Sequence, residues 1–160
     1  VVPDRFVVSL RRFRGCPAPG WWLQSVSTDS VMEIKYFRGG IIDIEFIIQY
    51  LQLRHAGNHP SLLSTNTSEA LDRLSAQDLL NESDAETLKY ALAIFQGIQG
   101  HLRLTLDGPL NGQDFSILPK PLQKSLASMS GCDRPEELTD CLKALAARVL
   151  EIYEKIVMNN

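Results

Sequence analysis

The sequence lacks the cysteine pattern of a disulfide-rich or zinc-binding protein. Its 160 residues contain three cysteines, Cys16, Cys132 and Cys141, with no Cys-x-x-Cys spacing. An odd number of cysteines without that spacing argues against both a disulfide framework and a zinc knuckle. We therefore expect reduced thiols and a cytoplasmic protein.

The sequence also lacks an excess of basic residues and a long apolar run. The formal net charge is −3, whereas a nucleic-acid binder normally carries a strong positive excess. A membrane-spanning helix needs about 20 apolar residues, and the longest run here, from Ile41 to Ile48, is interrupted by Asp43 and Glu45. The first residues show no signal-peptide pattern. We expect no nucleic-acid partner and no membrane association.

Apolar residues with a helical period fill the second half of the chain. From Asp84 they recur at three- and four-residue steps over about six turns, and Asp107-Gly108-Pro109 ends this helix. A shorter helix is expected around 121–129, closed by Gly131. After Pro135, a last helix has a continuous apolar seam that should face the interior of a bundle. The seam consists of Leu138, Leu142, Leu145, Val149, Ile152 and Ile156.

Two sequence patterns predict helix starts. Asn66 is followed three residues later by Glu69, and Ser83 by Glu86. Both have the spacing of a capping box, in which a side-chain oxygen accepts a hydrogen bond from a free N–H of the first turn. Together with the periodic segments, they predict an all-α protein: a helical bundle over residues 33–160, preceded by a short irregular or strand-like leader over residues 1–32.

The glycine pair Gly39-Gly40 opens directly into the apolar segment that begins at Ile41. Glycines allow close approach of the backbone to another group, and a helix start offers unpaired N–H groups and a positive dipole end. An anion could therefore bind there. An ordinary tight loop before a helix is the competing interpretation.

Asp43 and Glu45 follow the glycine pair and point about 200° apart on a helix, so they cannot chelate one ion together. Glu45 shares its face with the polar residues Gln49 and Gln52, whereas Asp43 shares its face with apolar neighbours. Acidic residues also stabilise a first helical turn through the dipole, by up to about 1 kcal/mol. This explains Asp43 less well, because Ile47 and Tyr50 share its face and a buried carboxylate without a partner costs several kcal/mol. We expect Asp43 either to stay hydrated at a cleft or to pair with Arg38, Arg54 or Lys35.

No metal site or nucleophile can be assembled from the sequence. His55 and His59 lie near a helix end, and a third ligand is missing. None of the cysteines has an activating neighbour. We therefore assign no catalytic residue and no metal ligand.

One segment of the chain resembles the signature of glutamine synthetase adenylyltransferases. It consists of the glycine pair, Asp-Ile-Glu-Phe at 43–46 and Tyr-Leu-Gln-Leu-Arg-His at 50–55. The resemblance extends more weakly from Glu33 to Met158. In that family each half of a duplicated chain has a nucleotidyltransferase domain followed by a helical bundle. The AMP-removing half usually has Arg where this chain has Ile42, so the resemblance favours the AMP-attaching, carboxy-terminal half.

The resemblance implies the function of a parent enzyme: transfer of AMP from ATP to a tyrosine of glutamine synthetase, with Mg²⁺, in nitrogen metabolism. Glutamine synthetase and the PII signalling protein would be its partners. Gly39, Gly40, Asp43 and Glu45 would contact the nucleotide or support residues that do, so we assign them as cofactor-binding.

The catalytic signature of that family is absent from this sequence. Two-metal nucleotidyl transfer needs several carboxylates, which the family provides in a Gly-Ser-x-x-Asp-x-Asp motif. This chain contains neither Gly-Ser nor Asp-x-Asp. We therefore expect a fragment that is inactive alone and holds no cofactor by itself. The alternative is a free-standing helical protein-interaction module that uses either the seam of the last helix or the Trp21-Trp22 patch as its binding surface.

Overall fold

The computed structural model describes residues 37–105, 115–132 and 134–158, which form α-helices and short helical turns and contain no strand. The all-α prediction is confirmed for these residues, and the predicted leader lies outside them. The α-helices are α3 (Ile41–His55), α4 (Thr67–Ala76), α5 (Glu82–Thr105), α6 (Lys120–Met129) and α7 (Leu138–Tyr153). The 3₁₀ turns are η1 (Pro60–Leu62), η2 (Phe115–Ile117) and η3 (Pro135–Glu137), and a π-helical turn, η4 (Glu154–Met158), continues α7.

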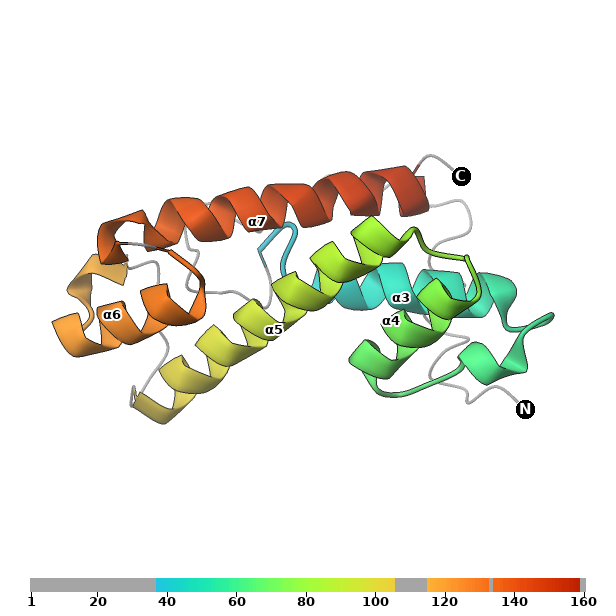
Figure 1. The fold of residues 1–160 in the computed structure, drawn as a ribbon, viewed down its shortest axis with the longest axis horizontal. Helices are drawn as coiled ribbons and strands as arrows, with labels where there is room; N and C mark the ends of the chain where they lie inside the picture. The colour runs from blue at the N-terminus through green and yellow to red at the C-terminus, as the bar shows by residue number, and fades with distance from the viewer. Residues whose placement is uncertain (1–36, 106–114, 133, 159–160) are drawn as a thin grey trace, which may run out of the picture.

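The two longest helices form the frame of the bundle. In Figure 1, α7 runs along one edge of the molecule and α5 crosses it diagonally, while α3 and α4 lie at one end and α6 at the other. Helix α3 contacts α4, α5 and α7, so it lies at the centre of the packing at its end of the bundle. An ion pair between Lys155 Nζ and Asp84 Oδ2, 2.7 Å apart, links the end of α7 to the start of α5.

The core is one continuous apolar cluster to which all five helices contribute. Helix α3 buries one apolar stripe in this core, because Ile44, Ile47 and Ile48, which lie on the same helix face, are all nearly inaccessible to solvent. The apolar series of α5 predicted to face inward is buried at Leu88, Leu92, Phe95, Ile98 and Leu102, and its last member, Leu106, lies outside the described residues. Phe95 of α5 also meets the ring of Phe37 edge-on, with ring centroids 5.5 Å apart.

The seam of α7 packs into this core as predicted, with one difference. Leu138, Leu142 and Val149 are at most 1 % exposed, and Ile152 and Ile156 are buried as well. Leu145 is only partly buried, and the neighbouring Ala146 takes the fully inward position. The small side chain at 146 matters because another segment approaches the helix backbone there, as described below.

The predicted helix starts have different outcomes. The Asn66 side chain accepts a hydrogen bond from the backbone N–H of Glu69, at 3.1 Å, so this prediction is confirmed. The prediction that Ser83 caps the next helix is wrong, because α5 already begins at Glu82. Asn81 is the capping residue, and its Oδ1 accepts from the Ser83 N–H at 2.9 Å. Asn81 and Ser83 can both cap a helix and lie two positions apart, so the sequence allowed two starts for α5. The helix begins after the earlier of the two residues.

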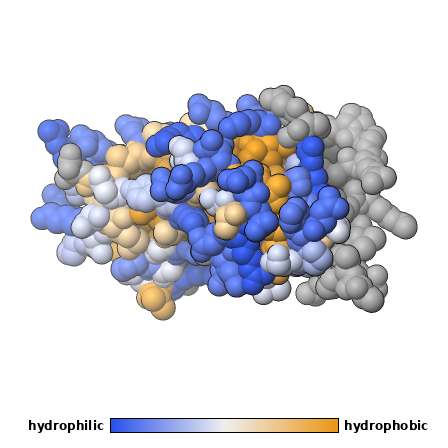
Figure 2. Space-filling view, turned by 45° about the vertical axis from the view of Figure 1, so that its right-hand side comes forward, coloured by the Kyte–Doolittle hydropathy of each residue, from blue (hydrophilic) through white to orange (hydrophobic). Residues whose placement is uncertain are grey.

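The face of the molecule drawn in Figure 2 is mainly polar: hydrophilic side chains predominate on it, and apolar patches lie between them. Among the described residues, no helix combines the length and the apolar character needed to span a lipid bilayer.

Candidate functional site

The glycine turn before α3 is pressed against the backbone of α7. Gly39 is buried and has a φ of +78°, which L side chains rarely adopt. A Cβ atom at this position would lie 2.1 Å from the carbonyl oxygen of Ala146. Both the conformation and the available space therefore require glycine. The close backbone approach expected from the glycine pair exists, and the group approached is helix α7.

The carboxylate of Asp43 closes this turn. Its Oδ2 accepts a hydrogen bond from the Gly39 N–H at 2.5 Å. Burial raises the pKa of Asp43 above its ordinary value of 3.8, while the Gly39 hydrogen bond and the charge of Arg38 oppose the shift. The net direction shows that the loss of hydration outweighs the two stabilising contacts. Asp43 is thus a half-buried acid with a partner, but its hydrogen-bond partner, the Gly39 N–H, was not among the predicted ones, and Arg38, which was, acts on it through its charge.

Arg38 and Tyr153 complete the group around the turn. The Arg38 guanidinium carbon lies 5.7 Å from the centroid of the Tyr153 ring, within the range of a cation–π contact. Burial raises the pKa of Tyr153, the negative charge of Asp43 raises it further, and Arg38 lowers it. The two side chains therefore belong to the same electrostatic environment as Asp43. We call Arg38, Gly39, Gly40, Asp43 and Tyr153 the glycine-turn cluster.

The other predicted partners of Asp43 lie elsewhere. Arg54 donates from Nη1 to the hydroxyl of Tyr50 at 2.9 Å, and Lys35 lies outside the described residues. Tyr153, which directly follows the seam residue Ile152, was not predicted from the sequence to belong to this site. The available signal was the aromatic residue at the end of an otherwise aliphatic seam.

Glu45 faces a different cleft. With Gln49 and Gln52 it lines a polar hollow between α3 and the start of α4. The predicted polar stripe on α3 is thus present, and it is separate from the glycine-turn cluster. The assignment of Gly39, Gly40, Asp43 and Glu45 to nucleotide contacts stays a prediction.

The cluster offers hydrogen-bonding and charged groups, with limited capacity for covalent or metal chemistry. Within residues 37–105, 115–132 and 134–158, no three His, Cys, Asp or Glu side chains are placed to hold a metal ion. The chemistry available at the cluster is proton binding by Asp43, a guanidinium charge from Arg38 and the hydroxyl of Tyr153. These groups can orient or support a phosphate-bearing ligand without performing two-metal catalysis.

Comparison with known proteins shows which family this chain is related to. The model of the family described as GlnD PII-uridylyltransferase matches residues 24–157, which include the glycine turn and nearly all of the described helices. The chain belongs to this family. The match begins inside the predicted leader, before the resemblance noted from Glu33 onward.

Curated proteins that are similar to this chain carry the name bifunctional glutamine synthetase adenylyltransferase/adenylyl-removing enzyme. The protein of Rhodopseudomonas palustris (strain TIE-1) is 42 % identical over 88 residues, 55 % of this chain and 9 % of the relative. The protein of Bradyrhizobium diazoefficiens is 42 % identical over 124 residues, 78 % of this chain and 12 % of the relative. The protein of Xanthobacter autotrophicus is 32 % identical over 126 residues, which are 78 % of this chain and 12 % of the relative. The resemblance to adenylyltransferases is therefore confirmed, and the chain spans about a tenth of these relatives' length.

Proposed function

We propose that this chain is the helical bundle that follows the nucleotidyltransferase domain in the AMP-attaching, carboxy-terminal half of a glutamine synthetase adenylyltransferase. The observation that carries the proposal is the family match over residues 24–157 together with relatives of that name. The presence of Ile42, where the AMP-removing half usually has Arg, supports the choice of half.

In this proposal the glycine-turn cluster forms one wall of the active cleft. Gly39 lets the turn lie against α7, and the Asp43 carboxylate holds the turn in that position. Arg38 then carries a positive charge at the same end of α3, where the helix dipole also favours an anion. ATP and Mg²⁺ would bind mainly to the catalytic domain, which supplies the metal-binding carboxylates, and this wall would help to orient the nucleotide phosphates.

The partners in this proposal are glutamine synthetase, as the protein that receives AMP, and the PII signalling protein as a regulator, in the cytoplasm. The names of the curated relatives support the first of these. The free-standing interaction module is less well supported. One of its two predicted binding surfaces, the seam of α7, packs against α3 and α5 and is therefore not free to bind a partner. The other, the Trp21-Trp22 patch, lies outside the described residues.

A direct experiment tests whether the chain acts only as part of a larger enzyme. Purified chain is incubated with glutamine synthetase, Mg²⁺ and labelled ATP. We expect no AMP incorporation above a blank without the chain, because positioning groups alone cannot replace the metal-binding carboxylates. Incorporation above the blank would show that the chain carries its own catalytic centre and would overturn the proposal.

A further inference from the structure

Helix α7 supports the glycine turn at two points. At Ala146 the helix backbone lies directly against Gly39. Tyr153 follows seven residues later, which is about two helical turns, so it stands on the same face of α7 as Ala146. There its ring meets the guanidinium of Arg38, the residue directly before Gly39. One face of α7 therefore holds both the backbone of the turn and the side chain of Arg38.

The Tyr153 ring is well placed to hold a neighbouring group. The residue is only 9 % exposed and belongs to the apolar core. Burial raises the pKa of Tyr153 above its ordinary value of 10.0, so the phenol is neutral at physiological pH. Arg38 therefore meets an uncharged aromatic ring, and the attraction is a cation–π contact. Arginine suits such a contact because its guanidinium is planar and weakly hydrated.

The Arg38 guanidinium keeps hydrogen-bonding capacity in this position. None of the ion pairs between described residues includes Arg38. Asp43 is close enough to interact with it by charge, but Oδ2 of Asp43 accepts from the Gly39 N–H. A guanidinium carries its N–H donors at the edge of its plane. A ring that covers the face of this plane leaves those donors available, and phosphate groups bind arginine through them.

We infer that Tyr153 positions Arg38 for the nucleotide: its ring fixes the guanidinium beside the glycine turn and leaves the edge donors available to a phosphate oxygen of ATP. This inference rests on the proposed function, in which the glycine-turn cluster is a wall of the active cleft. Tyr153 does not touch the substrate and acts through Arg38. The contact needs the aromatic ring and not the hydroxyl, so phenylalanine should replace Tyr153 and leucine should not.

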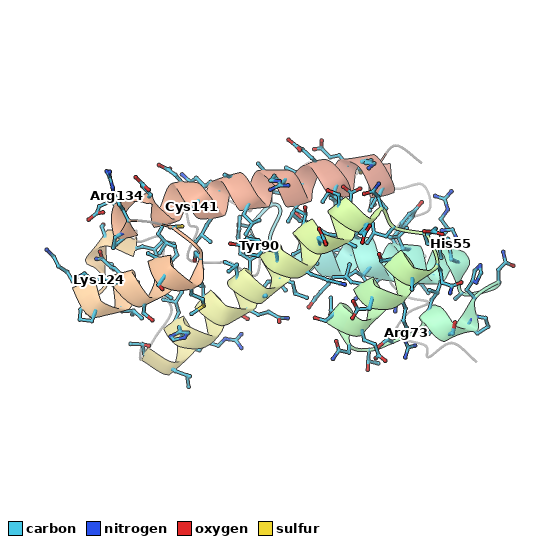
Figure 3. The ribbon with its side chains drawn as sticks, viewed as in Figure 1. His55, Arg73, Tyr90, Lys124, Arg134 and Cys141 are labelled. Carbon is cyan, nitrogen blue, oxygen red and sulfur yellow. The ribbon has the colours of Figure 1, made fainter. Side chains whose placement is uncertain are left out.

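A second arginine–tyrosine pair provides a matched control. The Arg54 guanidinium carbon lies 5.9 Å from the centroid of the Tyr50 ring, a distance similar to that between Arg38 and Tyr153. Helix α3 ends at His55, labelled in Figure 3, so this pair lies towards the opposite end of the helix from the glycine turn. Tyr50→Leu therefore removes the same kind of contact without altering the glycine-turn cluster.

NMR of the full chain tests the contact independently of enzyme activity. An aromatic ring shifts the resonances of protons that lie over its face, so the side-chain protons of Arg38 should be shifted upfield. We expect this shift to persist in Tyr153→Phe and Tyr50→Leu and to disappear in Tyr153→Leu. Unshifted Arg38 resonances in the unmodified chain would overturn the inference and leave the proposed function intact.

Kinetics test the role of the contact, in a chimera in which this chain replaces the matching segment of its Rhodopseudomonas palustris relative. Tyr153→Leu should raise the KM for ATP at least about fivefold, the size of an ordinary cation–π contact. The kcat should change little, because a contact made equally in the ground and transition states affects KM alone. Tyr153→Phe and Tyr50→Leu should change KM less than about twofold.

A double variant separates positioning from a structural role. If Tyr153 acts through Arg38, Tyr153→Leu should have no further effect on KM once Arg38→Gln is present. Tyr153→Met, which fills the space with a flexible apolar side chain, is a second variant without a ring. Unfolding midpoints check that each variant is folded in the assay.

Three kinetic results would overturn the inference. They are an unchanged KM for ATP in Arg38→Gln, an unchanged KM in the folded variants without a ring, and an equal Tyr153→Leu effect with and without Arg38→Gln. If Asp43→Asn still lowers the rate of the same chimera, the proposed function stands and only the role of Tyr153 fails. If Asp43→Asn also leaves the rate unchanged, both fail.

Discussion

Asp43 and Gly39 act together: the carboxylate accepts from the glycine N–H, and the glycine lies against the carbonyl of Ala146. The sequence predicted that the glycine pair allows close approach and that Asp43 either stays hydrated at a cleft or has a partner. It could not predict that α7 is the approached group, because that contact joins residues far apart in the chain. Local sequence patterns indicate that a residue makes a close contact, and the packing of distant segments determines which group it contacts.

Replacing Gly39 with alanine should destabilise the fold by at least about 2 kcal/mol, from the strained conformation and the collision with Ala146. Gly57→Ala is the matched control, because a Cβ there meets nothing within 4 Å; its effect should stay within about 0.5 kcal/mol. Urea unfolding of both variants measures the difference. Equal stability of the two variants would mean that the turn does not press on α7.

Two substitutions at Asp43 separate its hydrogen bond from its charge. Asp43→Asn retains an oxygen that can accept from Gly39, whereas Asp43→Ala leaves that N–H unpaired and should cost about 1–3 kcal/mol. Urea unfolding at neutral pH should therefore rank alanine well below asparagine. Indistinguishable stabilities would argue against the hydrogen bond.

The raised pKa of Asp43 also predicts a pH dependence. The folded state retains the Asp43 proton above 3.8, the ordinary value, so the stability contributed by protonated Asp43 is present below that value and is lost as the pH rises through the raised pKa. The asparagine side chain of the Asp43→Asn variant does not titrate. The stability of this variant relative to the unmodified chain should therefore increase from about pH 3 to about pH 7. A relative stability that falls over this range would mean that the pKa is lowered.

At the level of helices, periodicity was the most informative signal. It predicted the inward faces of α5 and α7, because both helices pack one stripe against a common core. It was less reliable at helix starts, where Asn81 and Ser83 competed as caps, and at Leu145, where Ala146 faces the core. Which residue caps a helix, and how the helix is rotated about its axis, depend on the neighbouring helices. The sequence of a single segment does not contain that information.

The α7 seam can be tested by three truncations in one helix. Leu142→Ala should cost about 2–5 kcal/mol, because Leu142 lies in the packed core. Leu145→Ala should cost less, since Leu145 is only partly buried, and Lys143→Ala, on the exposed face, should change stability by no more than about 0.5 kcal/mol. Denaturant midpoints give the ranking. A Leu145 variant less stable than the Leu142 variant would mean that α7 is rotated relative to the structure described.

At the scale of the whole molecule, the proposed function makes this chain a part of a larger enzyme. The bundle has a closed core, a glycine turn that requires contact with α7, and no metal cluster among its described residues. The chain spans 9–12 % of the length of its curated relatives. The central claim is that the glycine-turn cluster is a wall of the AMP-transfer site in such an enzyme.

The most direct measurement uses a chimera in which this chain replaces the matching segment of the Rhodopseudomonas palustris relative, with and without Asp43→Asn. The rate of labelled AMP transfer to glutamine synthetase is measured beside the unfolding midpoint, with Glu86→Gln as a control. The account predicts that Asp43→Asn lowers the rate at least about tenfold, or roughly 1.4 kcal/mol of barrier, while the unfolding midpoint does not fall. An unchanged rate in a folded, active chimera would contradict it and leave Asp43 with its structural role alone.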